Sequence, residues 1–462
     1  MTARVVIVGA GVAGLTTAHR LLLSEPSLDV EILEAAPAVG GRLSTAVVGG
    51  LELDAGPDSF VARKPWAVEL CRELDLELVE PDARGAFVWT ERGLIPLPPS
   101  ALGVPTDADE LLRWPGLSRS GRARAMSDLI RKARPGEGDE SLGALLRRRL
   151  GDEATDILVA PLLGGLFAGD VDRLGVAATF PELAGWERDF GSLIRGARAS
   201  AKAAREAGPM FLRPAGGMRR LIDALVGAVG VERIRTSTSV TGLAREGERS
   251  VVRAEDGGSA SSADAVVVAT PAFVAADLVG EVAGDAARHL AAIPYVGTAV
   301  VLLVYPEGTA VAVPEATGFV VPSARAPMTA ATFLSRKWPD PALHDRAVLR
   351  CFVGAAGSED VLDEPDEDMV DAVCRHLAAV LPLPELPEAS RVVRWPRSMP
   401  QYEVGHVARV AAIHESLPAG IVVVGNAYGG VGVADAVRSA NEAAERVRAH
   451  LLGDPIGTER VG

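Results

Sequence analysis

The sequence predicts a multi-domain protein that combines an α/β domain, an α+β domain with a mixed sheet, and an inserted helical domain. The chain has 462 residues, too many for one hydrophobic core at about 100 to 200 residues per domain. It opens on a strand, a glycine turn, a helix and a second strand, and it closes on a strand, a glycine-rich loop and a helix. Between these ends, a helix-rich stretch is followed by several strands.

The two ends of the chain are expected to form one nucleotide-binding domain. Residues 4–8 and 29–33 are expected to form strands, with a glycine turn and a helix between them. Strand-like runs recur later at residues 234–236, 240–245, 251–254, 265–269 and 421–424. The predicted first domain therefore takes in residues 1–72, 207–290 and 405–462.

The rest of the chain is expected to form two further domains. Residues 105–206 have the character of helices, and residues 73–104 with 291–404 alternate strands with one helix, as in an α+β substrate domain. The helical stretch is rich in arginine: Arg119, Arg122, Arg124, Arg131, Arg134, Arg147, Arg148 and Arg149. A solvated helix face is the simpler interpretation, and binding to anionic lipid or another acidic partner is the alternative.

Charge and cysteine usage narrow the function classes. A formal net charge of −14 argues against general nucleic-acid binding, which needs an excess of Lys and Arg on one face. Cys71, Cys351 and Cys374 lie too far apart in the sequence for a metal knuckle or a disulfide framework, so we expect no metal and a reducing compartment. The first strand begins near the N-terminus, and no apolar run reaches about 18 residues, so we expect a cytoplasmic protein.

The strongest motif is the turn Gly9-Ala10-Gly11-Val12-Ala13-Gly14. It follows a strand and opens a helix, as a dinucleotide-binding turn must. Gly9 permits the tight turn, Gly11 lets a pyrophosphate approach the backbone, and Gly14 lets the helix pack closely on the strand. Glu34 ends the second strand, where its carboxylate is expected to accept hydrogen bonds from ribose hydroxyls and to disfavour NADP.

Two further glycine elements strengthen this prediction. Ala35 leads into the Gly40-Gly41-Arg42 turn, where Arg42 is expected to neutralise a phosphate or to border the cofactor ring. Near the C-terminus, a glycine-rich loop opens the last helix and offers a second helix N-terminus with a positive dipole end. The candidate cofactor residues of that loop are Gly425, Val431, Gly432 and Val433.

The segment from Glu34 to Arg42 resembles the flavin superfamily that includes amine oxidases, phytoene desaturases and porphyrinogen oxidases. The resemblance, rather than the spacing, implies that the cofactor is FAD and that the first domain is a Rossmann-like FAD-binding domain. It implies that Val240 binds the adenine through its main chain, and that Thr270 also belongs to the cofactor site. It further implies that the last helix faces the flavin ring.

Several segments resemble porphyrinogen oxidases in particular, from the run 55–60 to the run 394–402. This resemblance places Gly56, Pro57, Asp58 and Ser59 at the flavin ring and Trp395 beside it. An ordinary core aromatic is the alternative interpretation of Trp395. No catalytic residue is assigned, because the resemblance implies that placement of the cofactor does most of the work.

Within that family, the run 58–65 resembles the coproporphyrinogen III oxidases of Gram-positive bacteria. The loop 97–103 has no arginine, whereas plant and animal protoporphyrinogen oxidases carry one there. Lys64 is then expected at the rim of the active site, where a cation suits a substrate with four carboxylates. A solvated surface lysine is the alternative for Lys64, and protoporphyrinogen IX is the alternative substrate.

The resemblance implies three successive two-electron oxidations of a porphyrinogen, with oxygen as acceptor and peroxide as by-product. Partners are then the porphyrinogen, oxygen and FAD, with contact to a membrane surface or to the next enzyme of the haem pathway left open. A flavin amine oxidase is one rival, although only 4% of the residues are aromatic and an aromatic cage would be poorly supplied. A non-enzymatic escort protein of the same fold is a more distant alternative. The oligomeric state is left open as well.

Overall fold

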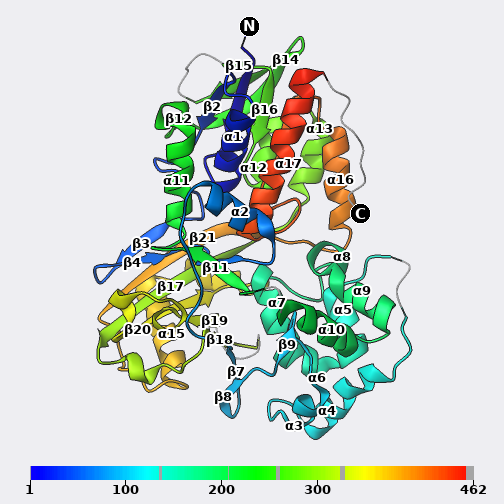
Figure 1. Cartoon of the computed structure of the whole chain (residues 1–462), viewed down its shortest axis with the longest axis vertical. Helices are drawn as coiled ribbons and strands as arrows, with labels where there is room; N and C mark the ends of the chain where they lie inside the picture. The colour runs from blue at the N-terminus through cyan, green and yellow to red at the C-terminus, as the bar shows by residue number, and fades with distance from the viewer. Residues whose placement is uncertain (1, 135–137, 206–207, 256–260, 323–327, 454–462) are drawn as a thin grey trace.

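The structure is a computed structural model that describes residues 2–134, 138–205, 208–255, 261–322 and 328–453. Its core elements are a five-stranded parallel sheet and a seven-stranded mixed sheet, with a group of helices beside them (Figure 1). The fold is therefore α/β and α+β multi-domain, as predicted. The predicted domain boundaries stay a prediction, and residues 1, 206, 207 and 462, at which some of them fall, lie outside the described residues.

The five-stranded sheet is assembled from distant parts of the chain in the order β12-β2-β1-β16-β22. Its strands are β1 (Arg4–Val8), β2 (Asp29–Leu33), β12 (Ile234–Arg235), β16 (Ala265–Val268) and β22 (Ile421–Val423). All neighbouring pairs are parallel, with Val6 opposite Glu31 on one side and Val266 on the other. Because the central strands are covered on both faces, they are continuous runs of buried apolar residues.

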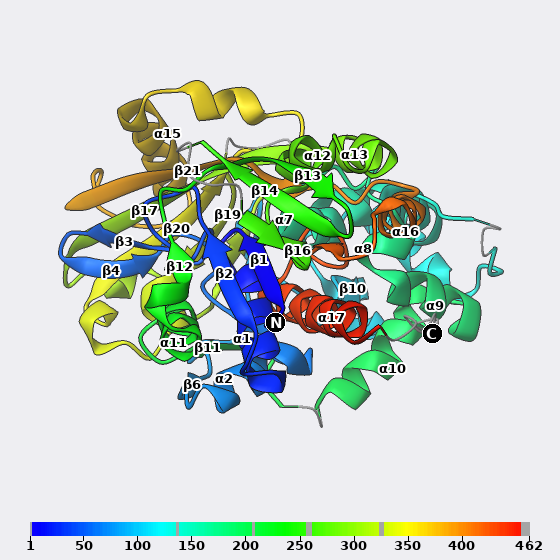
Figure 2. The ribbon, with the colours of Figure 1, turned by 90° about the horizontal axis from the view of Figure 1, so that it is seen from above.

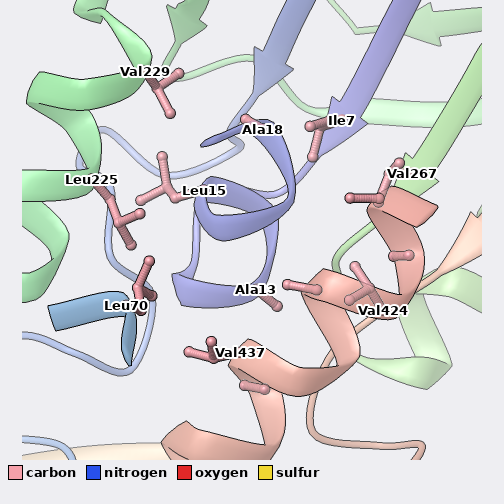
Figure 3. Packing of buried hydrophobic residues seen from close by; sticks show 14 of the residues in the cluster. Ile7, Ala13, Leu15, Ala18, Leu70, Leu225, Val229, Val267, Val424 and Val437 are labelled. Carbon is pink, nitrogen blue, oxygen red and sulfur yellow. The ribbon is translucent and has the colours of Figure 1, made fainter. Parts of the chain in front are cut away.

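Helices cover one face of this sheet and a smaller sheet covers the other (Figure 2). The first face packs against α1 (Val12–Ser24), α11 (Arg219–Val229) and α17 (Val433–Leu452). The second packs against α12 (Ala272–Val279) and the antiparallel strands β13 (Val240–Glu246), β14 (Arg249–Ala254) and β15 (Ser261–Ala263). Figure 3 shows the first core, in which Leu15 of α1 meets Leu225 of α11 while Ala13 lies beside α17.

The seven-stranded sheet has the order β21-β17-β20-β19-β18-β7-β8 and is mixed, because β18 pairs in parallel with β7. Its strands are β7 (Phe87–Thr90), β8 (Gly93–Pro96), β17 (Tyr295–Glu307), β18 (Gly318–Val320), β19 (Met328–Phe333), β20 (Arg346–Val353) and β21 (Ala389–Pro400). Helix α15 (Asp366–Ala378) packs on its apolar face. The longest strands, β17 and β21, run beneath the five-stranded sheet (Figure 1).

The helical part lies beside the seven-stranded sheet and has a core of its own (Figure 1). Its helices are α3 (Ala108–Arg113), α4 (Arg119–Met126), α5 (Leu142–Leu150), α6 (Asp152–Ala154), α7 (Ala160–Phe167), α8 (Val176–Thr179), α9 (Pro181–Phe190) and α10 (Leu193–Arg205). Residues 155–159 form a π-helical turn between α6 and α7.

The arginine run of the helical part is not simply a solvated face. Arg147 pairs with Asp156 and Asp172, at 2.8 and 3.0 Å. Arg148 pairs with Glu187 at 2.6 Å, and the Arg149 guanidinium is buried with Asp128. These contacts hold the helices of this part together and leave little of that positive charge for an acidic partner.

Eleven further strands and α-helices complete the described fold. They are β3 (Thr45–Val48), β4 (Leu51–Asp54), β5 (Phe60–Val61), α2 (Pro65–Glu73), β6 (Leu78–Val79), β9 (Ser100–Ala101), β10 (Val104–Pro105), β11 (Phe211–Pro214), α13 (Gly284–Ala291), α14 (Leu334–Lys337) and α16 (His406–Ser416). None of the helices in the described ranges is both long and apolar enough to cross a bilayer.

Candidate active site

A cavity of about 690 Å³ opens at the carboxyl ends of the parallel strands. Val8, Leu33 and Val424, at or just after the ends of β1, β2 and β22, line it together with the turns that follow those strands. Such an edge is the usual ligand site of an open α/β sheet. The predicted residues that line the cavity are Gly9, Gly11, Val12, Ala13, Glu34, Ala35, Gly41, Arg42, Pro57, Val240, Thr270, Trp395, Gly425, Val431, Gly432 and Val433.

The glycine turn between β1 and α1 is built as the motif predicts. Gly9 has a φ of +106°, and a Cβ there would lie 2.8 Å from the Ala269 oxygen. A Cβ on Gly14 would lie 2.0 Å from the Gly9 oxygen, so only glycine allows α1 to pack this closely. By contrast, a Cβ on Gly11 would meet no atom within 4 Å, which leaves its backbone open to the cavity.

Glu34 also holds the first glycine turn in place, a role that the sequence does not reveal. Its Oε2 accepts a hydrogen bond from the Ala10 N–H at 2.7 Å, and its Oε1 accepts one from the Ala36 N–H at 2.9 Å. The Gly40 N–H also donates to the Ala10 oxygen at 2.9 Å. Glu34 therefore holds the first glycine turn in place while each carboxylate oxygen keeps a further lone pair for a ligand in the cavity.

Three positive features face the cavity without a protein partner. The Arg42 guanidinium makes no hydrogen bond or ion pair with the described part of the chain, although burial lowers its pKa. Helices α1 and α17 both begin after a glycine, Gly11 and Gly432, and neither N-terminus has a side-chain cap. Free N–H groups and an unpaired guanidinium suit a pyrophosphate or another anionic group.

Aromatic and apolar side chains form the opposite wall of the cavity. Trp395 lies on β21 and donates its indole N–H to the Ala55 oxygen at 3.1 Å. Tyr402 holds the loop before α17, because its hydroxyl donates to the Asn426 oxygen at 2.7 Å and accepts from the Gly430 N–H at 2.8 Å. Pro57 and Val431 complete this wall.

Four predicted cofactor residues do not line the cavity: Gly14, Gly56, Asp58 and Ser59. Gly14 and Gly56 support it through close packing, since a Cβ on Gly56 would lie 1.6 Å from the Arg42 oxygen. The Asp58 carboxylate is buried against Lys337 at 2.9 Å. An ion pair in the protein interior thus occupies this carboxylate, and contact between Asp58 and the cofactor stays a prediction.

Lys64 is also not a free cation. Its Nζ lies 2.7 Å from Oδ1 of Asp435, in the first turn of α17, and its side chain is 45% exposed. The Asp435 carboxylate balances much of the positive charge of Lys64, which the sequence analysis expected to attract the carboxylates of a substrate. Contact between Lys64 and the substrate stays a prediction.

Lining residues that were not predicted include Val274, Leu278, Pro396, Ser398 and Asn426. Val274 and Leu278 lie one helical turn apart on α12, a spacing that could have indicated a shared face. Pro396 and Ser398 lie where the register of β21 shifts against β17, at a β-bulge. Bulges redirect side chains near binding sites, but no local signal in the sequence marks this one.

Thiol and metal chemistry find no support within the described ranges. Burial raises the pKa of Cys71 to about 12 and also raises that of Cys374, so these thiols stay protonated. No group of three His, Cys, Asp or Glu side chains in those ranges is arranged to hold a metal ion. The lining carboxylates, Glu34 and Glu255, lie near Val240, at the end of the cavity predicted for the adenine.

The geometry thus fits an extended dinucleotide that carries a flat ring against Trp395. The chain belongs to the family of flavin containing amine oxidoreductases, whose sequence profile matches residues 12–448. The protein is an FAD-dependent oxidoreductase, and the cavity fits that cofactor through Gly11, Arg42 and the free helix N-termini.

Individual relatives are similar to this chain over nearly its whole length. The chain is 34% identical to coproporphyrinogen III oxidase of Bacillus subtilis, over 97% of this chain and 98% of the relative. It is 32% identical to coproporphyrinogen III oxidase of Staphylococcus aureus, over 98% of this chain and 100% of the relative. A solved structure from Exiguobacterium is 31% identical with a TM-score of 0.87, and covers 98% of this chain and 99% of its own.

Proposed function

We propose that this protein oxidises coproporphyrinogen III to coproporphyrin III in haem biosynthesis, with FAD as cofactor and oxygen as final acceptor. The observation that carries the proposal is similarity over nearly the whole length to coproporphyrinogen III oxidases. The cavity supports it, because it joins a dinucleotide turn to an apolar wall at Trp395. Bound FAD supplies the hydride acceptor.

The net reaction needs little acid–base help from the protein. Each of three steps removes a hydride from a macrocycle carbon and one proton, and in total four carbon-bound and two nitrogen-bound hydrogens leave the macrocycle. One oxygen molecule takes up the two electrons and two protons of each step and leaves as hydrogen peroxide. No titratable side chain is therefore required as a strong base.

The residues of this chain would instead bind and orient the cofactor. Arg42 and the N-terminal turn of α1 would hold anionic groups of the cofactor, and Glu34 would accept from its ribose. The N-terminus of α17 would face the ring, where negative charge accumulates on reduction. Tyr402 keeps that helix end in place by holding the loop that precedes it.

Coproporphyrinogen III is favoured over protoporphyrinogen IX by the loop 97–103. Leu97 and Leu102 pack against the core of the helical part, and the loop presents no arginine to a carboxylate. We also propose that Lys64 contributes to the rim of the site, that the chain divides into the three domains predicted above, and that the protein works in the cytoplasm. The ion pairs of Arg147, Arg148 and Arg149 lend no support to contact with a membrane.

A side-by-side assay tests the proposal. Coproporphyrinogen III and protoporphyrinogen IX, prepared anaerobically, are given to the purified holoenzyme at matched concentrations, and porphyrin fluorescence and oxygen uptake are followed. We expect coproporphyrinogen III to be oxidised faster, with about three oxygen molecules consumed per porphyrin. Faster oxidation of protoporphyrinogen IX would transfer the assignment to that substrate.

A further inference from the structure

Five charged side chains are buried together next to Pro57: Asp54, Asp58, Arg213, Lys337 and Arg350, called the buried charge cluster below. Asp58 is only 8% exposed and Lys337 only 9%. The Lys337 ammonium donates to both Asp58 oxygens, at 3.0 and 2.9 Å. The indole N–H of Trp338 donates to the same carboxylate at 3.2 Å.

These bonds connect two parts of the fold. Asp58 follows the segment 55–57, whose Pro57 lines the cavity, whereas Lys337 ends α14, directly after strand β19. Arg350, on the neighbouring strand β20, lies 3.7 Å from Asp58. The C-terminal end of the segment is therefore held by the seven-stranded sheet.

The other end of the segment is held in the same way. Asp54 accepts a hydrogen bond from the Met218 N–H at 3.0 Å and lies 3.6 Å from Arg213. The Arg213 guanidinium in turn stacks over the Trp338 ring, 4.2 Å from its centroid. A buried carboxylate thus anchors each end of the three residues between Asp54 and Asp58.

The middle of the segment contacts two residues of the cavity. Gly56 packs on the backbone of Arg42 so closely that a Cβ would lie 1.6 Å from the Arg42 oxygen. The Ala55 oxygen accepts the indole N–H of Trp395 at 3.1 Å. Any shift of the segment would therefore move Arg42 or Trp395, both of which line the cavity.

The hydrogen-bonding capacity of the cluster is not fully used. Within the described ranges Nε and Nη1 of Arg350 and Nε of Arg213 have no hydrogen-bond partner, and Asp340 adds a third carboxylate near Arg213. Burial alone would raise the pKa of Asp58, but the charges of Lys337 and Arg350 outweigh burial and hold this pKa below its usual range. Apolar residues often replace such buried ion pairs without loss of stability, so stability alone does not explain the cluster.

We propose that Lys337 is a positioning residue for the redox reaction. Through Asp58 it fixes the segment 55–57 against Arg42 and Trp395, and its own positive charge favours the more negative, reduced state of the cofactor. This inference rests on the proposed function only in that FAD occupies the cavity.

Replacing Lys337 tests the inference on the holoenzyme. We expect Lys337→Met to shift the midpoint potential of the bound flavin to more negative values and to lower kcat about tenfold, with KM changed less than about twofold. Lys337→Arg, which keeps the charge, is expected to retain the wild-type potential. Asp58→Asn combined with Lys337→Met leaves the net charge unchanged, so kcat should fall while the potential moves less than in Lys337→Met.

Asp128→Asn is the matched control, because Asp128 forms an equally buried ion pair with Arg149 in the helical part, at 2.5 Å. It should lower thermal stability and leave the potential and kcat unchanged. The inference is overturned if Lys337→Met behaves like this control. Should Lys337→Met not fold, the double variant is compared with the control instead. The potential is measured by dye equilibration without substrate, so inactivity of the wild type toward coproporphyrinogen III would count against the proposed function alone.

Discussion

Gly11 and Gly14 lie in the same turn, but a side chain at each of these positions would meet different surroundings. A Cβ on Gly14 would collide with the Gly9 oxygen, so this glycine serves the packing of α1 on β1. A Cβ on Gly11 would meet only the open cavity. A change at Gly11 should therefore affect the ligand and spare the fold.

We expect Gly11→Val to purify as a folded protein with less than about a tenth of the wild-type flavin, because its side chain would fill the space of the pyrophosphate. The ratio of flavin absorbance to protein absorbance measures this. Gly227→Val is the control, since Gly227 lies on exposed α11 surface and a Cβ there also meets nothing within 4 Å. A Gly11→Val protein with full flavin content would show that the turn does not bind the pyrophosphate.

The sequence predicts single residues well where the signal is local. Gly9, Gly11 and Glu34 belong to one βαβ unit, and each lines the cavity as expected. The ion pairs of Asp58 and Lys64 were not predicted, because their partners lie far away in the chain, 279 and 371 residues from them. No pattern of spacing reveals such pairs, and an acidic or basic residue on its own does not show whether it is already neutralised.

Helix α16 connects to the site through one histidine. His406 is 1% exposed, its ring stacks on Tyr402 with 4.0 Å between centroids, and its Nε2 bonds to the Ala427 oxygen at 3.0 Å. The helix thereby packs against the loop that precedes α17. Burial lowers the pKa of His406 to about 4, from the ordinary 6.5.

This shift predicts a pH dependence of stability. Because the folded pKa lies below the unfolded one, the contribution of His406 is complete above pH 6.5 and is lost as the pH falls toward 4. The loss is about 3 kcal/mol. His406→Gln keeps a donor for Ala427 but does not titrate, so urea unfolding at pH 7 and pH 4.5 should differ less for it than for the wild type. His344→Gln, at an exposed position, should leave the difference in stability between pH 7 and pH 4.5 unchanged. If both variants gave the same difference, His406 would not account for the loss of stability.

Elements are predictable in proportion to the strength of their apolar pattern. The strands β1, β16 and β22 are apolar apart from Arg4 and lie where the sequence indicates them. Helix α16 was not predicted, because only His406 and Ile413 are buried along its length and its apolar stripe is weak. The π-helical turn at residues 155–159 has no sequence signature either.

The whole molecule places the cavity where segments from both ends and the middle of the chain converge. The glycine turn of β1, the strand β13, the bulge of β21 and the loop before α17 all contribute to it. The opening and closing motifs predict that the chain returns to one sheet, and the structure confirms the shared sheet. The width of the cavity depends on long-range packing such as Gly56 on Arg42, which the sequence does not show.

We expect this cavity to bring a flavin and a porphyrinogen together for direct oxidation. Anaerobic mixing of the purified holoenzyme with coproporphyrinogen III in a stopped-flow instrument tests it most directly, with the flavin absorbance near about 450 nm as the signal. We predict that this absorbance disappears as porphyrin forms and returns when oxygen is admitted. A flavin that stays oxidised in the presence of excess coproporphyrinogen III would contradict the account.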